Sequence, residues 1–153
     1  LEVDAPSSLL ANLKPTHIVL GPGPGRPEQS ELTMSFAHAA LKGKTPPLLG
    51  ICLGHQAIGL AAGWKLGPSE HGAVHGVPDG ILSGNQHQVM TRYHSLALTQ
   101  TNNRLEVKST DAATNQIVMA LSHPELPVTG VQYHPESAGS ANGLAIFHDF
   151  LGQ

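Results

Sequence analysis

The sequence contains a single cysteine, Cys52, among 153 residues. An internal disulfide is therefore excluded, and Cys52 is a buried apolar filler, an ordinary thiol or a functional thiolate. Charged residues are scarce, at 12% of the chain, and the formal net charge is −3. Without a basic cluster, nucleic acid is not expected as a partner. No apolar run approaches the about 20 residues of a membrane-spanning helix and no signal peptide opens the chain, so we expect no membrane partner and a cytoplasmic protein.

Glycine and proline are abundant, with 17 and 12 residues, which indicates many tight turns between short elements. The length predicts a single domain over residues 1–153. In the first half, apolar runs predict strands at 17–20 and 47–51, and helical spacing predicts helices at 31–41, capped by Ser30, and at 56–62. The continuous apolar character of the two strands is typical of a parallel sheet covered on both faces.

The second half contains short alternating runs separated by turn residues, which predict hairpins. The expected strands are 89–93, 96–99, 105–109, 117–121 and 128–133. Residues 141–151 place Leu144, Phe147 and Leu151 on one face and predict a final amphipathic helix. Residues 67–85 show no clear period. The whole pattern predicts an α/β fold.

Cys52 stands between two glycines, Gly50 and Gly54, at the end of an expected strand and the start of an expected helix. A nucleophile on such a sharp turn is held in a strained, exposed position, and small neighbours allow the backbone to turn tightly. The helix N-terminus is expected to lower the pKa of the thiol and to direct backbone N–H groups at an oxyanion. Alone, this motif would favour a buried structural cysteine that packs near a turn.

A cysteine nucleophile needs a base and a group that orients the base, and His134 and Glu136 follow the expected strand 128–133. His134 would pair with the thiol. Glu136, two residues later, would bind the far ring nitrogen and fix the tautomer.

Four segments together resemble class I, triad-type glutamine amidotransferase domains. These segments are Gly23-Pro24-Gly25-Arg26-Pro27, Gly50-Ile51-Cys52-Leu53-Gly54-His55-Gln56, Arg92-Tyr93-His94-Ser95-Leu96 and Gly130-Val131-Gln132-Tyr133-His134-Pro135-Glu136-Ser137. The third is similar to the glutaminase subunits of anthranilate synthase and aminodeoxychorismate synthase. The resemblance implies a flavodoxin-like fold with a mixed, mostly parallel central sheet flanked by helices.

The resemblance also implies roles for particular residues. Cys52 would attack L-glutamine, His134 would move protons, and Glu136 would orient His134. Backbone N–H groups of Leu53 and of Gly23 or Gly25 would bind the oxyanion. Gln56, Ser95 and Leu96 would hold the amino-acid end of the substrate. Ammonia would pass to a chorismate-binding synthase subunit, and no cofactor or metal is implied.

Other interpretations remain open beside this one. The chain could be a catalytically silent amidotransferase-like binding subunit, or a γ-glutamyl hydrolase of related fold. His71, His75 and His87 cluster in one irregular stretch but lack the spacing of metal ligands, so we expect ordinary turn histidines.

The start of the chain differs from the family pattern. Domains that carry these motifs usually begin with a strand and helix before the segment that here opens at Leu1, so we expect this domain to lack its first strand and helix. The opening residues themselves are expected to enter a strand. The segment between Gln56 and Arg92 also looks shorter than the pattern.

Overall fold

The computed structural model describes residues 5–152. Its elements in chain order are α1 (Ala5–Leu13), β1 (Ile18–Leu20), the 3-10 helix η1 (Pro27–Gln29), α2 (Glu31–Ala40), β2 (Leu48–Ile51), α3 (Leu53–Ala61), β3 (Lys65–Pro68), β4 (Val74–Ser83), β5 (Gln86–His94), β6 (Leu96–Thr99), β7 (Glu106–Asp111), β8 (Val118–Ser122), β9 (Val128–Val131) and α4 (Gly143–Leu151).

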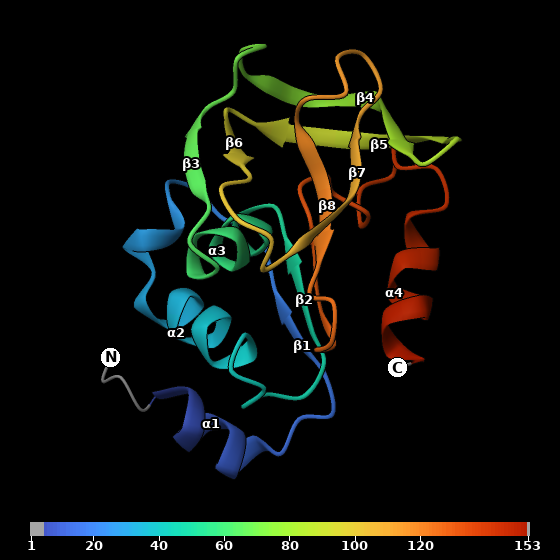
Figure 1. Cartoon of the computed structure of the whole chain (residues 1–153). Coiled ribbons are helices and arrows are strands. Elements are labelled where there is room, and N and C mark those ends of the chain that lie inside the picture. Colours follow the sequence, from blue (N-terminus) through green and yellow to red (C-terminus); the bar gives the residue numbers. More distant parts are fainter. Residues whose placement is uncertain (1–4, 153) are drawn as a thin grey trace.

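Seven strands form one mixed sheet in the order β1-β2-β9-β8-β7-β4-β5, and β3 pairs with β6 in a small second sheet. Helices α2 and α3 cover one face of the large sheet and α4 covers the other, with α1 beside α2 (Figure 1). The expected α/β fold with a mixed sheet and flanking helices is confirmed. Within residues 5–152, none of the helices has the length and hydropathy of a membrane span.

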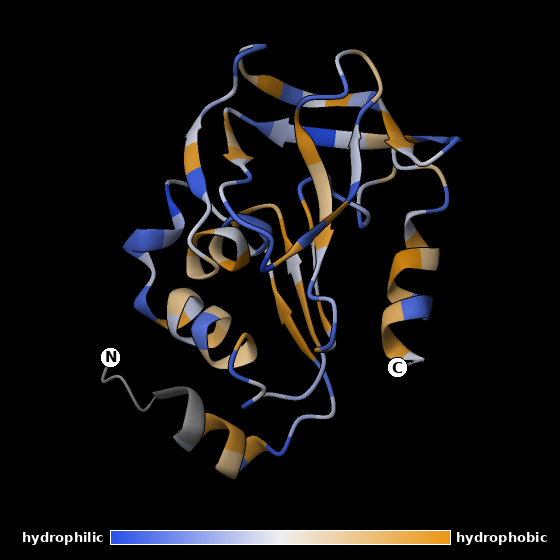
Figure 2. Ribbon diagram, in the orientation of Figure 1, coloured by the Kyte–Doolittle hydropathy of each residue, from blue (hydrophilic) through white to orange (hydrophobic). Residues whose placement is uncertain are grey.

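Strand β2 shows why the sequence builds this arrangement. All of its residues are buried. Leu48 packs into the cluster beneath α2 and α3, whereas Leu49 and Ile51 pack into the cluster beneath α4. Successive strand residues face opposite sides, so an unbroken apolar run is what a strand buried on both faces requires. Figure 2 shows this apolar centre between β1, β2 and the helices.

One expectation about the sheet needs correction. Parallel pairing is confined to β1 with β2 and β2 with β9. The remaining pairings, from β9 through β8, β7 and β4 to β5, are antiparallel. The sheet is therefore mixed but not mostly parallel, because the second half connects its strands by turns and hairpins instead of crossover helices.

The other elements agree with or extend the expectations. The bounds of the hairpin strands and the final helix lie within three residues of the predicted ranges, and the Ser30 hydroxyl caps α2 through Thr33 N. Helix α1, β3 and β4 were not predicted. Of the opening segment expected to enter a strand, residues 1–4 lie outside the described residues, and Ala5 begins a helix. The absence of a first strand and helix stays a prediction.

Candidate active site

Cys52 occupies the turn between β2 and α3 with φ 52° and ψ −99°, a strained backbone conformation. Its N–H donates to the Val131 carbonyl of β9 at 2.8 Å. A methyl group on Gly50 would come within 2.5 Å of the Gly54 backbone, and one on Gly54 would collide with the Leu20 backbone. The two glycines thus allow the sharp turn that the sequence predicts.

His134 follows β9 and lies across from β5. Its N–H donates to the Thr91 carbonyl at 2.9 Å, and its carbonyl accepts from the Ser140 hydroxyl at 2.5 Å. The ring Nδ1 lies 2.7 Å from Glu136 Oε1. A carboxylate only accepts, so Nδ1 carries a proton, and in the neutral imidazole Nε2 is the acceptor. Nε2 is buried and has no hydrogen-bond partner among residues 5–152, so it is available to a reacting group.

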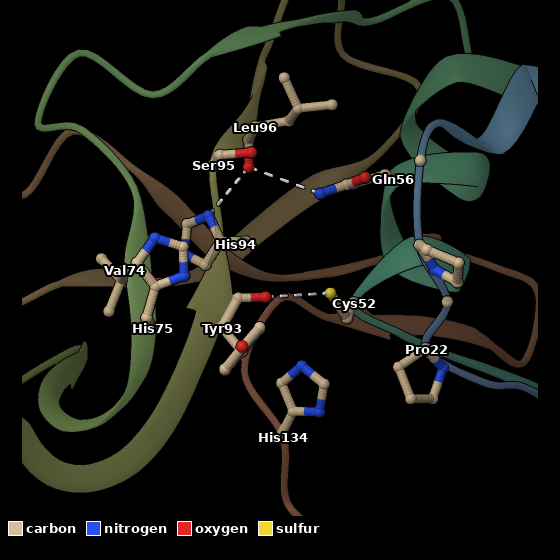
Figure 3. A pocket seen from close by; sticks show the side chains of 13 residues that line it. Pro22, Cys52, Gln56, Val74, His75, Tyr93, His94, Ser95, Leu96 and His134 are labelled. Atoms are coloured by element: carbon tan, nitrogen blue, oxygen red, sulfur yellow. Dashed lines mark hydrogen bonds between the residues drawn. The ribbon is translucent and has the colours of Figure 1, made fainter.

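The thiol is not paired with this imidazole. Cys52 Sγ donates to the Tyr93 carbonyl at 3.8 Å (Figure 3). It accepts from Gln132 Nε2 at 3.6 Å. Burial raises the pKa of the Cys52 thiol to about 11, and hydrogen bonds from the Leu53 backbone and the Gln132 side chain only partly oppose it. The expectation of a lowered pKa was wrong, because desolvation of the thiolate outweighs the helix N-terminus.

A cavity of about 370 Å³ opens between the Cys52 turn and the β5–β6 segment. This volume lies within the usual range for small-ligand sites. The residues around it come from both halves of the chain: Pro22, Gly23, Pro24, Gly25, Cys52, Gln56, Val74, His75, Tyr93, His94, Ser95, Leu96 and His134. Residues far apart in sequence thus meet around one sulfur atom.

The structure brings together most of the residues singled out from the sequence. Cys52, His134, Gly23, Gly25, Gln56, Ser95 and Leu96 all line the cavity. Glu136 stands behind His134, 43% exposed. Leu53 lies outside the lining, with its backbone against the sulfur. The individual roles stay predictions.

The glycine-rich loop after β1 forms the wall opposite β5. Gly25 has φ +77°, a conformation that side chains rarely adopt. A methyl group on Gly23 would lie 3.2 Å from Leu53 Cδ2. Gly23 therefore lets this wall approach the Cys52 turn, and Gly25 permits the backbone conformation of the loop.

Several neighbours of the sulfur were not singled out. Gln132 is fully buried. The sequence could have indicated it, because it is a polar residue within an otherwise apolar strand. Tyr93 acts through its carbonyl, which no sequence pattern identifies. His75 lines the cavity and packs edge-on against the Tyr93 ring at 5.6 Å between centroids, whereas His71 lines a different hollow.

Comparisons with known proteins bear on the family of the chain. The model of the family "Glutamine amidotransferase class-I" matches residues 1–153. The anthranilate synthase component 2 of Saccharolobus solfataricus is 37% identical, with 94% of this chain and 79% of that protein aligned. The component 2 of Mycobacterium tuberculosis is 38% identical over 88% of this chain and 60% of its own length. An aminodeoxychorismate synthase of Streptomyces griseus is 39% identical over 88% of this chain and 19% of that protein.

Solved structures share the fold. A Thermoplasma acidophilum protein, described as a candidate component of GMP synthase, superposes with a TM-score of 0.81 at 20% identity, over 99% of this chain and 78% of that one. A Thermotoga maritima glutamine amidotransferase gives a TM-score of 0.66 at 18% identity, over 79% and 56% of the two chains. Since the family model spans the whole sequence and the relatives exceed 30% identity, the chain belongs to the class-I glutamine amidotransferase family.

Proposed function

We propose that this protein is a glutaminase that hydrolyses L-glutamine to glutamate and delivers the ammonia to a chorismate-utilising synthase. The observation that carries the proposal is the single thiol of the chain, set on a strained turn in the same cavity as His134, whose far nitrogen is held by Glu136. The names of the relatives, anthranilate synthase component 2 and aminodeoxychorismate synthase, support the class of partner.

In the proposed reaction, His134 Nε2 removes the thiol proton and Sγ attacks the side-chain amide carbon of glutamine. The C–N bond then breaks as His134 returns the proton to the leaving nitrogen, and ammonia departs. A γ-glutamyl thioester remains on Cys52. Water, deprotonated by His134, attacks the thioester carbon, and glutamate leaves as the thiol is restored. No cofactor or metal takes part.

Substrate and oxyanion would be held largely by backbone. The N–H of Leu53 and that of Gly23 or Gly25 would bind the oxyanion. Gln56 and the Ser95-Leu96 segment, on the far wall of the cavity, would bind the amino-acid end of glutamine. Such an arrangement places the amide carbon between Sγ and the glycine-rich loop.

The resting position of the thiol supports dependence on a partner. Sγ is turned to the Tyr93 carbonyl and burial raises its pKa to about 11, so the free chain holds a protonated thiol without a base. Tyr93 belongs to β5, and its side chain is among the exposed large apolar groups, at 57%. A synthase that covers Tyr93 and moves this strand would release Sγ toward His134. Such a complex would act in the cytoplasm.

The test measures glutamate release by the chain alone and with a chorismate-binding synthase component, together with the product formed. We expect slow release alone and faster release in the complex, with anthranilate or aminodeoxychorismate identifying the pathway. Cys52→Ser should abolish glutamine-dependent product while ammonium-dependent product continues, which is the internal control for an intact complex.

Two outcomes would oppose the proposal. If no glutamate is released in the complex and a glutamine-analogue electrophile fails to label Cys52, the chain is a silent binding subunit. If γ-glutamyl peptides are cleaved equally well with and without the synthase, the chain is a γ-glutamyl hydrolase.

A further inference from the structure

A buried arginine links the β4–β5 hairpin to the cavity wall. The Arg92 side chain is 4% exposed, and its Nη1 lies 2.5 Å from Asp79 Oδ2 on the neighbouring strand. Its Nε donates to His94 Nε2 at 3.2 Å. Arg92 therefore joins the partly exposed Asp79 to His94 on the cavity wall through its hydrogen bonds. Neither the proposed chemistry nor the proposed substrate binding uses Arg92.

The arginine determines the tautomer of His94. A guanidinium only donates, so His94 Nε2 must be an unprotonated acceptor. The proton then resides on Nδ1, which lies 2.8 Å from the Leu96 carbonyl and donates to it. Burial lowers the pKa of His94 to about 4, so this neutral form persists at neutral pH.

Hydrogen bonds of two side-chain amides, those of Gln56 and Gln132, connect the Leu96 carbonyl to the Cys52 sulfur. Gln56 Nε2 donates to Leu96 O at 3.4 Å and to Gln132 Oε1 at 3.1 Å. Because the Gln132 oxygen is occupied by Gln56, its nitrogen faces Cys52 Sγ, at 3.6 Å. Figure 3 shows His94, Leu96 and Gln56 along this wall beside Cys52.

We propose that Asp79, Arg92 and His94 are positioning residues, which hold the Leu96 carbonyl and, through Gln56, aim the Gln132 amide N–H at Cys52 Sγ. Each bond joins a fixed donor to a fixed acceptor, and the two halves of the series meet at the Leu96 carbonyl, which accepts from both His94 Nδ1 and Gln56 Nε2. A change at the distant end therefore reaches the thiol as a change in the orientation of Gln132. The proposal rests on Cys52 as the nucleophile, but not on glutamine as its substrate.

The test uses alkylation of the intact chain by iodoacetamide between pH 7 and 11, followed by intact mass. Cys52 is the only cysteine, so modification reports on that thiol without a partner or glutamine. Failure of the glutaminase proposal would leave this readout unaffected. His75 and His134 line the same cavity and Glu136 contacts His134 Nδ1. All three remain unchanged in the variants below, so they affect every profile alike.

The decisive pair is His94→Gln and His94→Asn. Asparagine keeps a donor near the Nδ1 position, whereas glutamine reaches the Nε2 position and loses the donor to Leu96. We expect the thiol of His94→Gln to be alkylated about three- to tenfold more slowly at pH values below its titration midpoint. This slowing corresponds to a rise in the thiol pKa of up to about one unit. Gln132→Met, which removes the final donor, should shift the profile by a similar amount, and His94→Asn should stay near the parent profile.

Asp79→Asn tests the proposal at a partly exposed position, and asparagine keeps an oxygen that can accept from Arg92. Its matched control is Glu106→Gln, which removes a carboxylate from the exposed Glu106–Lys108 pair on β7. We expect a smaller shift, about twofold, for Asp79→Asn and none for the control. If Asp79→Asn and His94→Gln lower the melting temperature but retain the parent alkylation profile, the residues only join the hairpin to the wall and the proposal is wrong. If His94→Gln does not fold, the Asp79→Asn profile decides alone.

Discussion

The two regions that meet at the cavity are built by different means. The turn at Cys52 depends on close backbone packing, with Gly50 against the Gly54 backbone and Gly54 against Leu20. The segment that carries His134 depends on hydrogen bonds, among them Thr91 N to Ser140 Oγ at 2.9 Å and Ser140 Oγ to the His134 carbonyl at 2.5 Å.

The regions differ in exposure as well. His55, next to the turn, is 0% exposed, whereas the Glu136 side chain is 43% exposed. Packing positions the nucleophile, and it tolerates neither added volume nor added charge. Polar contacts position the base, and one of them can be removed without opening the core. Substitutions and pH should therefore affect folding in the first region and chemistry in the second.

Acid should produce the largest effect, through histidines buried in the first region and on the cavity wall. Burial lowers the pKa of His55 to about 3 and that of His94 to about 4, from 6.5. Both are neutral in the folded chain at pH 5, while the unfolded chain binds protons below about 6.5, so stability is full above that pH and falls as the pH drops. At pH 5 the free energy of unfolding should be about 4 kcal/mol lower than at pH 7.5, about 2 from each histidine.

Urea denaturation at the two pH values measures this difference. His94→Asn removes one of the two groups and should reduce the loss to about half. Asp111, whose pKa is lowered by bonds from Thr114, Gln116 and Ile117, contributes only at lower pH. Equal midpoints at pH 5 and 7.5 would contradict the assignment of neutral buried histidines.

Gly54→Ala should give the next largest effect, because its methyl group would collide with the Leu20 backbone and separate α3 from β1. Overpacking of this kind costs about 3 kcal/mol where backbone is the obstacle. The matched control is Gly67→Ala on β3, where a methyl group meets nothing within 4 Å. A urea midpoint for Gly54→Ala equal to that of the control would show that the turn can relax.

The first region is also the one that the sequence predicts best. β1, β2 and α2 follow from apolar runs and a serine cap, since burial on both faces leaves a continuous pattern. Helix α3 begins at Leu53, three residues before the predicted start. Its glycines, Gly54 and Gly59, have low helix propensity and so weaken the helical pattern in the sequence. Both are required in the fold, because Gly54 packs against Leu20 and Gly59 against Leu98.

The parts of the fold and the site that the sequence does not predict depend on contacts between residues distant in the sequence. Strand β4 contains Gly76, Pro78 and Gly80, which interrupt any alternation, and its order comes from pairing with β5 along nearly its whole length. The sign of the thiol pKa shift could not be predicted for a related reason. A helix N-terminus contributes about 0.3–1 kcal/mol, and only the folded chain reveals how deeply Cys52 is buried.

Glu136→Gln should have the smallest effect on folding and a clear effect on chemistry, which makes it the sharpest test of the comparison. Glutamine can still accept from His134 Nδ1, now 2.7 Å from Glu136 Oε1, but it no longer stabilises the imidazolium that forms when the thiol loses its proton. Because Glu136 is 43% exposed, solvent screens part of that charge, and we expect kcat for glutamate release in the synthase complex to fall by about tenfold. The urea midpoint should match that of Glu106→Gln, which removes a carboxylate of similar exposure from the Glu106–Lys108 pair. A large loss of stability with unchanged kcat would mean that the second region, like the first, uses its polar contacts for folding.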